Sequence, residues 1–127
     1  MKNNLPFFSH YNSTHNEPRY QALIAEFGMA GYGRYWVLCE KIASSPGALL
    51  DLSSRVIRLT IVKALDFSSD EFDSFISFLG ADDIGLVRIQ GGMVTTDQIQ
   101  EDYRRVTKKR LKDRDAYMDF TPAGIQS

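Results

Sequence analysis

Apolar residues recur along most of the chain at intervals of three and four positions, the spacing that places side chains on one face of an α-helix. This pattern predicts helices at about 17–27, 30–43, 54–65, 69–79 and 97–120. Two regions break the spacing: a short apolar run at 48–52, and a pair of β-prone runs at 86–90 and 93–96. The sequence therefore predicts a mainly helical chain with a few short strands.

Several predicted helix starts coincide with residues that cap helices. Ser68 and Glu71 have the spacing of a capping box, in which each side chain accepts a hydrogen bond from the other residue's backbone N–H. Either Ser53 or Ser54 is expected to cap the helix that follows it, and the polar run 95–98 to begin the last helix.

The two β-prone runs are separated by the pair Gly91-Gly92. Glycine adopts the positive φ angles of a two-residue hairpin turn, so the runs are expected to form one β-hairpin. The register for such a loop pairs Ile89 with Val94 and Arg88 with Thr95.

The order of these elements is that of a winged helix-turn-helix: helix, short strand, helix, helix and a two-stranded hairpin. Its three helices and its wing would be 30–43, 54–65, 69–79 and 86–96. The helices at 17–27 and 97–120 are additions to that fold. We therefore expect a mainly α (α+β) winged helix-turn-helix with an extra N-terminal helix, a β-hairpin wing and a long C-terminal helix.

The chain has 127 residues, enough for one domain with its own core. We expect an extended arm at 1–16, the domain at 17–120 and a flexible tail at 121–127. The single Cys39 excludes an internal disulfide and lies in an apolar run, where a packed thiol is expected. No apolar run reaches the roughly 20 residues of a membrane span, and the N-terminus has no signal-peptide pattern, so a cytoplasmic protein without membrane contact is expected.

The net charge of −1 hides a strong separation of charge along the chain. Between Lys63 and Arg88 there is no basic residue, and acidic residues accumulate there: Asp66, Asp70, Glu71, Asp73, Asp82 and Asp83. The balance then reverses over a short stretch: Arg104, Arg105, Lys108, Lys109, Arg110, Lys112 and Arg114. Composition as a whole does not indicate nucleic-acid binding, but the local charge of the last helix does.

The third helix of a winged helix-turn-helix usually enters the major groove of DNA. Here that helix, 69–79, offers mainly acidic side chains, which repel phosphates and forgo the gain from counterion release. We therefore do not expect this helix to read DNA.

The C-terminal helix is the candidate for DNA contact. Its helical period places Ile99, Tyr103, Val106, Thr107 and Leu111 on one side. The expected nucleic-acid-binding residues lie on the other side or on the wing: Arg104, Lys108, Lys112, Arg105, Lys109 and Arg88. Such a surface suits phosphates but has no evident set of base-reading groups. A solvated or ion-paired helix face is the alternative interpretation.

The same charge separation also suits association between copies. The acidic region 66–83 of one copy is complementary to the basic region 104–112 of another, and a hairpin edge can pair across a two-fold axis. A homo-oligomer is therefore expected. The alternative function is a protein-interaction module that makes no nucleic-acid contact.

The sequence gives little support for catalysis. His10, His15 and Cys39 are too few for a zinc site, and the spacing of Gly28, Gly31 and Gly33 is not that of a dinucleotide-binding loop. We expect no catalytic residues, no metal, no cofactor and no small-molecule substrate.

The stretch from Phe27 to Glu40, with Phe8-Ser9-His10 and Asn16 upstream, resembles the N-terminal domain of phage replisome organisers, a family related to DnaD-type replication initiators. The matching positions within the stretch are Gly28, Gly31, Tyr32, Gly33, Tyr35, Trp36 and Glu40. The resemblance implies a winged-helix module that assembles the protein, with other replication proteins as partners. The loop-like end at 121–127 would fit an N-terminal domain of a longer protein, or a complete small protein.

Overall fold

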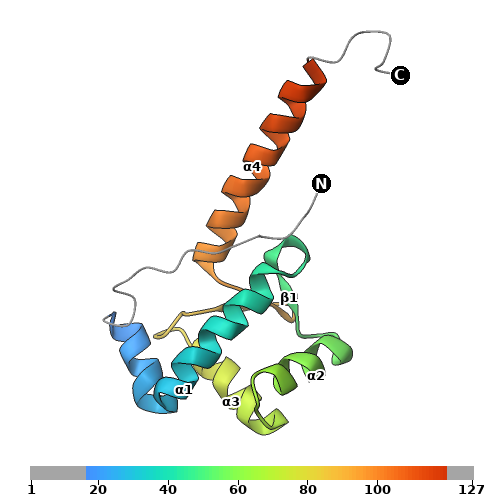
Figure 1. The fold of residues 1–127 in the computed structure, drawn as a ribbon. Coiled ribbons are helices and arrows are strands. Elements are labelled where there is room, and N and C mark those ends of the chain that lie inside the picture. The colour runs from blue at the N-terminus through green and yellow to red at the C-terminus, as the bar shows by residue number, and fades with distance from the viewer. Residues whose placement is uncertain (1–16, 120–127) are drawn as a thin grey trace.

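The computed structural model describes residues 17–119, with side chains up to Arg114. The predicted arm at 1–16, with its two histidines, and the predicted tail at 121–127 lie outside the described residues. The elements in chain order are α1 (Pro18–Ala43), the 3₁₀ turn η2 (Pro46–Ala48), β1 (Leu50–Asp51), α2 (Arg55–Ala64), α3 (Ser69–Leu79), β2 (Arg88–Gln90), β3 (Met93–Thr95) and α4 (Asp97–Asp119) (Figure 1).

The two helices predicted on either side of Gly28 are joined into one bent helix, α1. Gly28 has φ 72° and ψ −178°, a conformation that side chains with a Cβ rarely adopt, and the helix turns sharply there (Figure 1). Gly31 is needed for a different reason: a Cβ at this position would lie 2.3 Å from the Cβ of Phe27. The predicted turn is therefore confirmed, although the chain stays helical on both sides of a single residue.

Aromatic rings hold the bend of α1 closed. Tyr20 from the first segment stacks on Trp36 from the second, with ring centroids 6.0 Å apart and planes 8° apart. Tyr35 meets both rings edge-on. Phe27, next to the bend, packs edge-on against Phe75 of α3 at 5.2 Å. Gly28 thus turns the chain and the aromatic residues of this stretch pack in the core, as predicted.

Local capping defines α2 and α3 as the sequence indicated. The hydroxyl of Ser54 accepts the N–H of Ile57, and both hydrogen bonds of the Ser68–Glu71 capping box are present, at 2.9 and 3.2 Å. All four residues predicted to face inward from α3 are buried: Phe72, Phe75, Ile76 and Leu79. Arg34 attaches the end of α2 to α1, because its Nε donates to the carbonyl of Leu65, the residue that follows α2, at 2.7 Å.

The three strands form one antiparallel sheet in the order β1-β3-β2. The hairpin register is as predicted, with Ile89 opposite Val94 and Arg88 opposite Thr95. Gly91 and Gly92 both have positive φ, as the turn requires. The apolar run at 48–52 contributes only the short strand β1, which pairs Leu50 with Val94.

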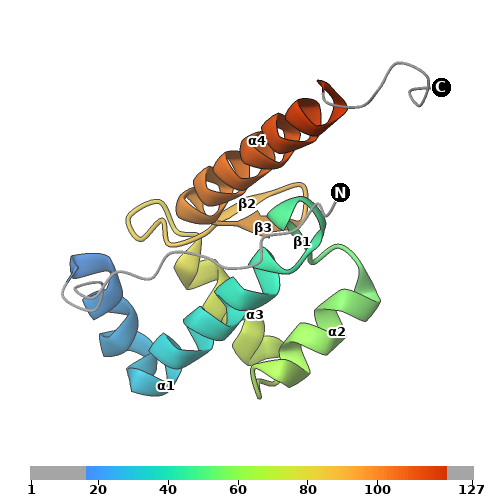
Figure 2. The same ribbon diagram turned by 45° about the horizontal axis from the view of Figure 1, so that its top comes forward.

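The described residues therefore form a mainly helical fold with a small three-stranded antiparallel sheet. Figures 1 and 2 both place α4 at one end of the molecule and α2 towards the other, and Figure 2 shows the sheet between α4 and α3. None of the helices in the described range has the length and apolar character that a membrane crossing needs.

Candidate nucleic-acid interface

The first turn of α4 is fixed to the rest of the fold by polar contacts. The hydroxyl of Thr96 accepts the N–H of Ile99 at 3.0 Å, which caps the helix. The side-chain amide of Gln100 donates to the carbonyl of Ala48 at 2.8 Å and to the hydroxyl of Thr95 at 3.0 Å. Ile99 itself is buried. The helix is therefore anchored at its start to η2 and β3.

A buried carboxylate lies one turn further along α4. Asp102 is only 1% exposed; its Oδ1 accepts a hydrogen bond from the amide of Gln98 at 3.0 Å and forms an ion pair with Arg105. The candidate residues predicted from the sequence did not include Asp102. The signal was available, since Asp102 follows Ile99 by three positions and precedes Val106 by four, which places a carboxylate on the apolar face.

The basic face of α4 consists of Arg104, Lys108, Lys109 and Lys112. All four side chains are exposed, and none forms an ion pair with any residue from 17 to 114. Arg104, Lys108 and Lys112 follow one another at i, i+4, so their side chains lie along one side of the helix. We call these four residues the basic face.

The other two predicted DNA-binding residues are engaged within the protein. The Nε of Arg88 lies 2.6 Å from the Oδ1 of Asp97, which joins the hairpin to the start of α4. Arg105 pairs with Asp102. Both arginine side chains remain largely exposed, so each borders the basic face with part of its charge already compensated.

The opposite side of α4 meets the body over its first half only. The residues predicted to share one side of the helix are indeed turned towards the body: Ile99 is buried, and Tyr103, Val106 and Thr107 are partly buried. Leu111, which was assigned to the same side, is 38% exposed. In Figures 1 and 2 the distal half of α4 extends away from every other labelled element. The basic face therefore continues from the body onto a projecting helix.

Several exposed side chains of α3 are acidic, and Figure 2 shows the sheet between this helix and α4. Two carboxylates of α3 already have local partners. The backbone N–H of Ser68 lowers the pKa of the Glu71 carboxyl, and Asp73 pairs with Arg58 of α2. Asp70, Asp82 and Asp83 are exposed and form no ion pair within 17–119.

Cys39 is packed in the core, as predicted. Its side chain is buried, and burial raises the pKa of the thiol to about 12. Because the thiolate is the nucleophilic form, a thiol with this pKa is inert at neutral pH. Burial also raises the pKa of the neighbouring Tyr35 hydroxyl, which therefore stays protonated.

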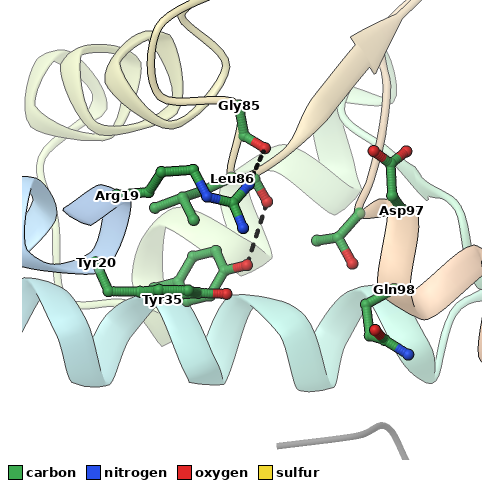
Figure 3. Close-up of a pocket in the computed structure, with 8 residues that line it drawn as sticks. Arg19, Tyr20, Tyr35, Gly85, Leu86, Asp97 and Gln98 are labelled. Carbon is green, nitrogen blue, oxygen red and sulfur yellow. Dashed lines mark hydrogen bonds between the residues drawn. The ribbon is translucent and has the colours of Figure 1, made fainter. Parts of the chain in front are cut away.

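A pocket of about 220 Å³ lies between the start of α1, the loop before β2 and the start of α4 (Figure 3). Two of its polar groups bind the loop. Arg19 donates to the carbonyl of Gly85 at 3.3 Å, and the Tyr35 hydroxyl donates to the carbonyl of Leu86 at 3.2 Å. These contacts attach the loop to α1, so we assign this pocket a structural role.

Comparison of the chain with protein-family models, curated proteins and solved structures found no significant match. Residues 17–119 contain no group of three or more histidine, cysteine or acidic side chains placed to hold a metal ion. Evidence for a function therefore comes from the geometry of the chain itself.

Proposed function

We propose that this chain is a winged helix-turn-helix adaptor of replication-initiation type. It self-associates and binds the DNA backbone without sequence preference through the basic face of α4. The second segment of α1, α2 and α3 correspond to the three helices of such a fold, and the β2–β3 hairpin to its wing. The order of the elements and the pairing of β1 with the hairpin support this assignment.

The observation that carries the proposal is the row of exposed cations on a projecting helix. At 1.5 Å per residue, Arg104 to Lys112 span about 12 Å of helix. Double-stranded DNA carries one negative charge per about 1.7 Å of its axis, so this length faces several phosphates at once. Each phosphate neutralised releases condensed counterions, and that release supplies most of the affinity in non-specific binding.

The amide side chains near the start of α4 are not free to read bases. Amide side chains bind adenine edges, and the two amides near the start of α4 are already engaged. Gln98 donates to Asp102, and Gln100 donates to Ala48 and Thr95. The basic face offers Arg104 and three lysines, and contacts of such cations with phosphates position a protein on DNA without specifying a sequence.

The position of the charges also explains why α3 is not the reading helix in this proposal. Its exposed side chains include Asp70, Glu71 and Asp73, and the sheet lies between this helix and α4 (Figure 2). If α3 entered the major groove, these carboxylates would approach phosphates while the basic face pointed away. Docking through α4 avoids that repulsion.

The test is a fluorescence-anisotropy titration of labelled duplex DNA at low and moderate salt. The Lys108→Glu, Lys109→Glu double variant is expected to lose binding. The matched control is Arg55→Glu, Lys63→Glu on α2, which changes the net charge equally but at the other end of the molecule. Binding that falls equally in both variants would show that only net charge matters, and absence of binding by the natural chain would refute the proposal.

A second candidate function is a protein-interaction module without DNA contact, in which copies associate head to tail. One observation favours it: the basic face lies on a helix that projects away from α3 and the exposed carboxylates of that helix (Figures 1 and 2). Such contacts are heterologous and build rings or filaments. Light scattering over a salt series tests this candidate, since oligomers held by these charges dissociate as salt increases.

A further inference from the structure

The outward face of α2 is apolar. Val56 is 76% exposed and Leu59 is 57% exposed, and Ile57 is exposed at the edge beside them. In Figures 1 and 2 this helix lies at the border of the molecule, with α3 and β1 on its inner side. Neighbouring apolar side chains on one exposed helix face are typical of a contact surface.

The inner face of α2 prevents the helix from turning this surface inward. Ile61 and Leu65 are buried in the core. Arg58 pairs with Asp73 of α3, and its guanidinium lies 5.3 Å from the ring centre of Phe72. The exposure of Val56 and Leu59 is therefore a fixed property of the fold.

A pocket of about 220 Å³ opens beside Ile57, between α2 and the C-terminal end of α1. Its hydroxyls are used internally: Thr60 donates to the carbonyl of Val56 at 2.9 Å, and Ser45 donates to that of Lys41 at 2.7 Å. An apolar cavity of about 150 Å³ holds a benzene molecule, so this pocket has room for one large apolar side chain.

Three exposed cations border this surface. Lys41 lines the pocket, and Arg55 and Lys63 lie near the two ends of α2. All three side chains are exposed, and none forms an ion pair with a described residue. Asp51, the nearest preceding acid, accepts hydrogen bonds from the backbone and hydroxyl of Ser53. An apolar surface with a positive border is complementary to an apolar segment with acidic flanks.

The same charges disfavour other occupants of this surface. Pairing of α2 with α2 of a second copy in antiparallel orientation would bring Arg55 close to Lys63. Docking of another copy's α4 would bring its basic face against the same cations. DNA would gain from the cations but would cover exposed apolar side chains with phosphates.

We propose that α2 and the adjoining pocket bind an acidic amphipathic helix of a partner protein. One large apolar side chain of that helix enters the pocket, others cover Val56 and Leu59, and its carboxylates face Lys41, Arg55 and Lys63. This is the helix-in-groove mode of recognition, with charge selecting the partner. The site is separate from the basic face of α4 and does not depend on DNA binding.

The test uses two dye-labelled peptides of about 18 residues, with leucines at i, i+3, i+4 and i+7 and either glutamate or lysine at the flanking positions. Anisotropy measures binding to the whole chain, and NMR chemical shifts locate it. The acidic peptide is expected to bind and to perturb α2 and the end of α1. The lysine peptide is expected not to bind.

Variants assign the contact to individual side chains. Val56→Ser with Leu59→Ser should weaken binding of the acidic peptide by about tenfold or more, because both apolar contacts are lost. Met29→Ser, on α1, is the matched control, since Met29 is 65% exposed and lies away from the surface. Lys63→Glu should also weaken binding, whereas Lys109→Glu on α4 should not. Because all these side chains are exposed, thermal unfolding should change little and will show that each variant folds.

Several results would overturn the proposal. These are no binding of the acidic peptide, equal binding of both peptides, or shifts confined to other elements. Dissociation of an oligomer by the Val56→Ser, Leu59→Ser variant in ultracentrifugation would assign the surface to a second copy instead. Binding of anionic lipid vesicles through α2, without binding of the acidic peptide, would assign it to a membrane. If the basic face of α4 does not bind DNA, the outcome of the peptide experiment is unaffected, so each proposal can be refuted without the other.

Discussion

The three glycines of α1 give a prediction in which neighbouring substitutions have opposite signs. The change is glycine to alanine at Gly28, Gly31 and Gly33, one at a time. Alanine restricts the unfolded chain, and where the native backbone accepts it the folded state gains about 0.5–1 kcal/mol. The backbone φ angle and the space around each glycine determine at which of the three positions alanine stabilises the folded state.

Gly28 and Gly31 are expected to lose stability for different reasons. At Gly28 the space for a Cβ is empty, but φ 72° with ψ −178° lies in a region almost restricted to glycine, which costs about 1–3 kcal/mol for alanine. At Gly31 the φ angle is not positive, but the new Cβ would lie 2.3 Å from that of Phe27. Because that atom belongs to the rigid start of the side chain, the helix must shift, at a typical cost of about 1–3 kcal/mol.

Gly33 is the matched control. It lies inside the same helix, has no positive φ, and no atom lies within 4 Å of the position a Cβ would take. Gly33→Ala is therefore expected to stabilise the protein by about 0.5–1 kcal/mol.

Thermal unfolding followed by circular dichroism measures all three variants. For a chain of this size 1 kcal/mol corresponds to about 4 °C in Tm, so Gly33→Ala should raise Tm by about 2–4 °C. Gly28→Ala and Gly31→Ala should each lower it by several degrees. If Gly33→Ala lowers Tm as far as Gly28→Ala, the bend is not localised at Gly28 and the reasoning is wrong.

Four further predictions concern the capping box, the core and the basic face. Ser68→Ala should cost about 1 kcal/mol in chemical denaturation, as loss of an N-cap usually does. Because the pKa of Glu71 is lowered in the folded state, its contribution is present above the ordinary carboxyl pKa and is lost as pH falls through the lowered value. The Glu71→Gln variant should therefore lose less stability on acidification than the natural chain, and an unchanged acid profile would contradict this. Phe75→Ala should cost about 3–5 kcal/mol, since the buried ring contacts Phe27 and Phe67; a cost below 1 kcal/mol would show that the core is arranged differently. Arg104→Gln should reduce the slope of log K against log salt in DNA binding by about 1, as loss of one phosphate contact does, and an unchanged slope would exclude Arg104 from the interface.

The features that the sequence predicted well depend on neighbouring residues. A capping box is complete within four positions, so Ser68 and Glu71 identify the start of α3 without any tertiary information. The hairpin register follows from the length of its loop and the positive φ of Gly91 and Gly92. Periodicity likewise placed the buried residues of α3 correctly.

The features that the sequence did not predict depend on contacts between distant segments. Whether α1 ends at Gly28 or bends there is decided by packing of Tyr20 on Trp36 across the bend. The pairing of Arg88 with Asp97 depends on where the hairpin meets α4. For α2, the spacing of apolar residues predicted the helix but not which of its faces points into the core, because apolar residues lie on both faces. Only the packing shows that Ile61 is buried while Val56 is exposed.

The basic face of α4 carries a cost that bears on its function. Arg104 with Lys108, Lys108 with Lys112, and Arg105 with Lys109 are like-charged pairs at i, i+4, and three such pairs destabilise a helix by about 1 kcal/mol in total. The anchored first turn, with its Thr96 cap and the contacts of Gln100, offsets this cost near the body. The distal half has no such support from the other described elements, and a polar helix of this kind is marginal in isolation. A polyanion that lies along the basic face removes the repulsion and stabilises the helix at the same time. In the proposed function, DNA binding therefore also stabilises the distal half of α4.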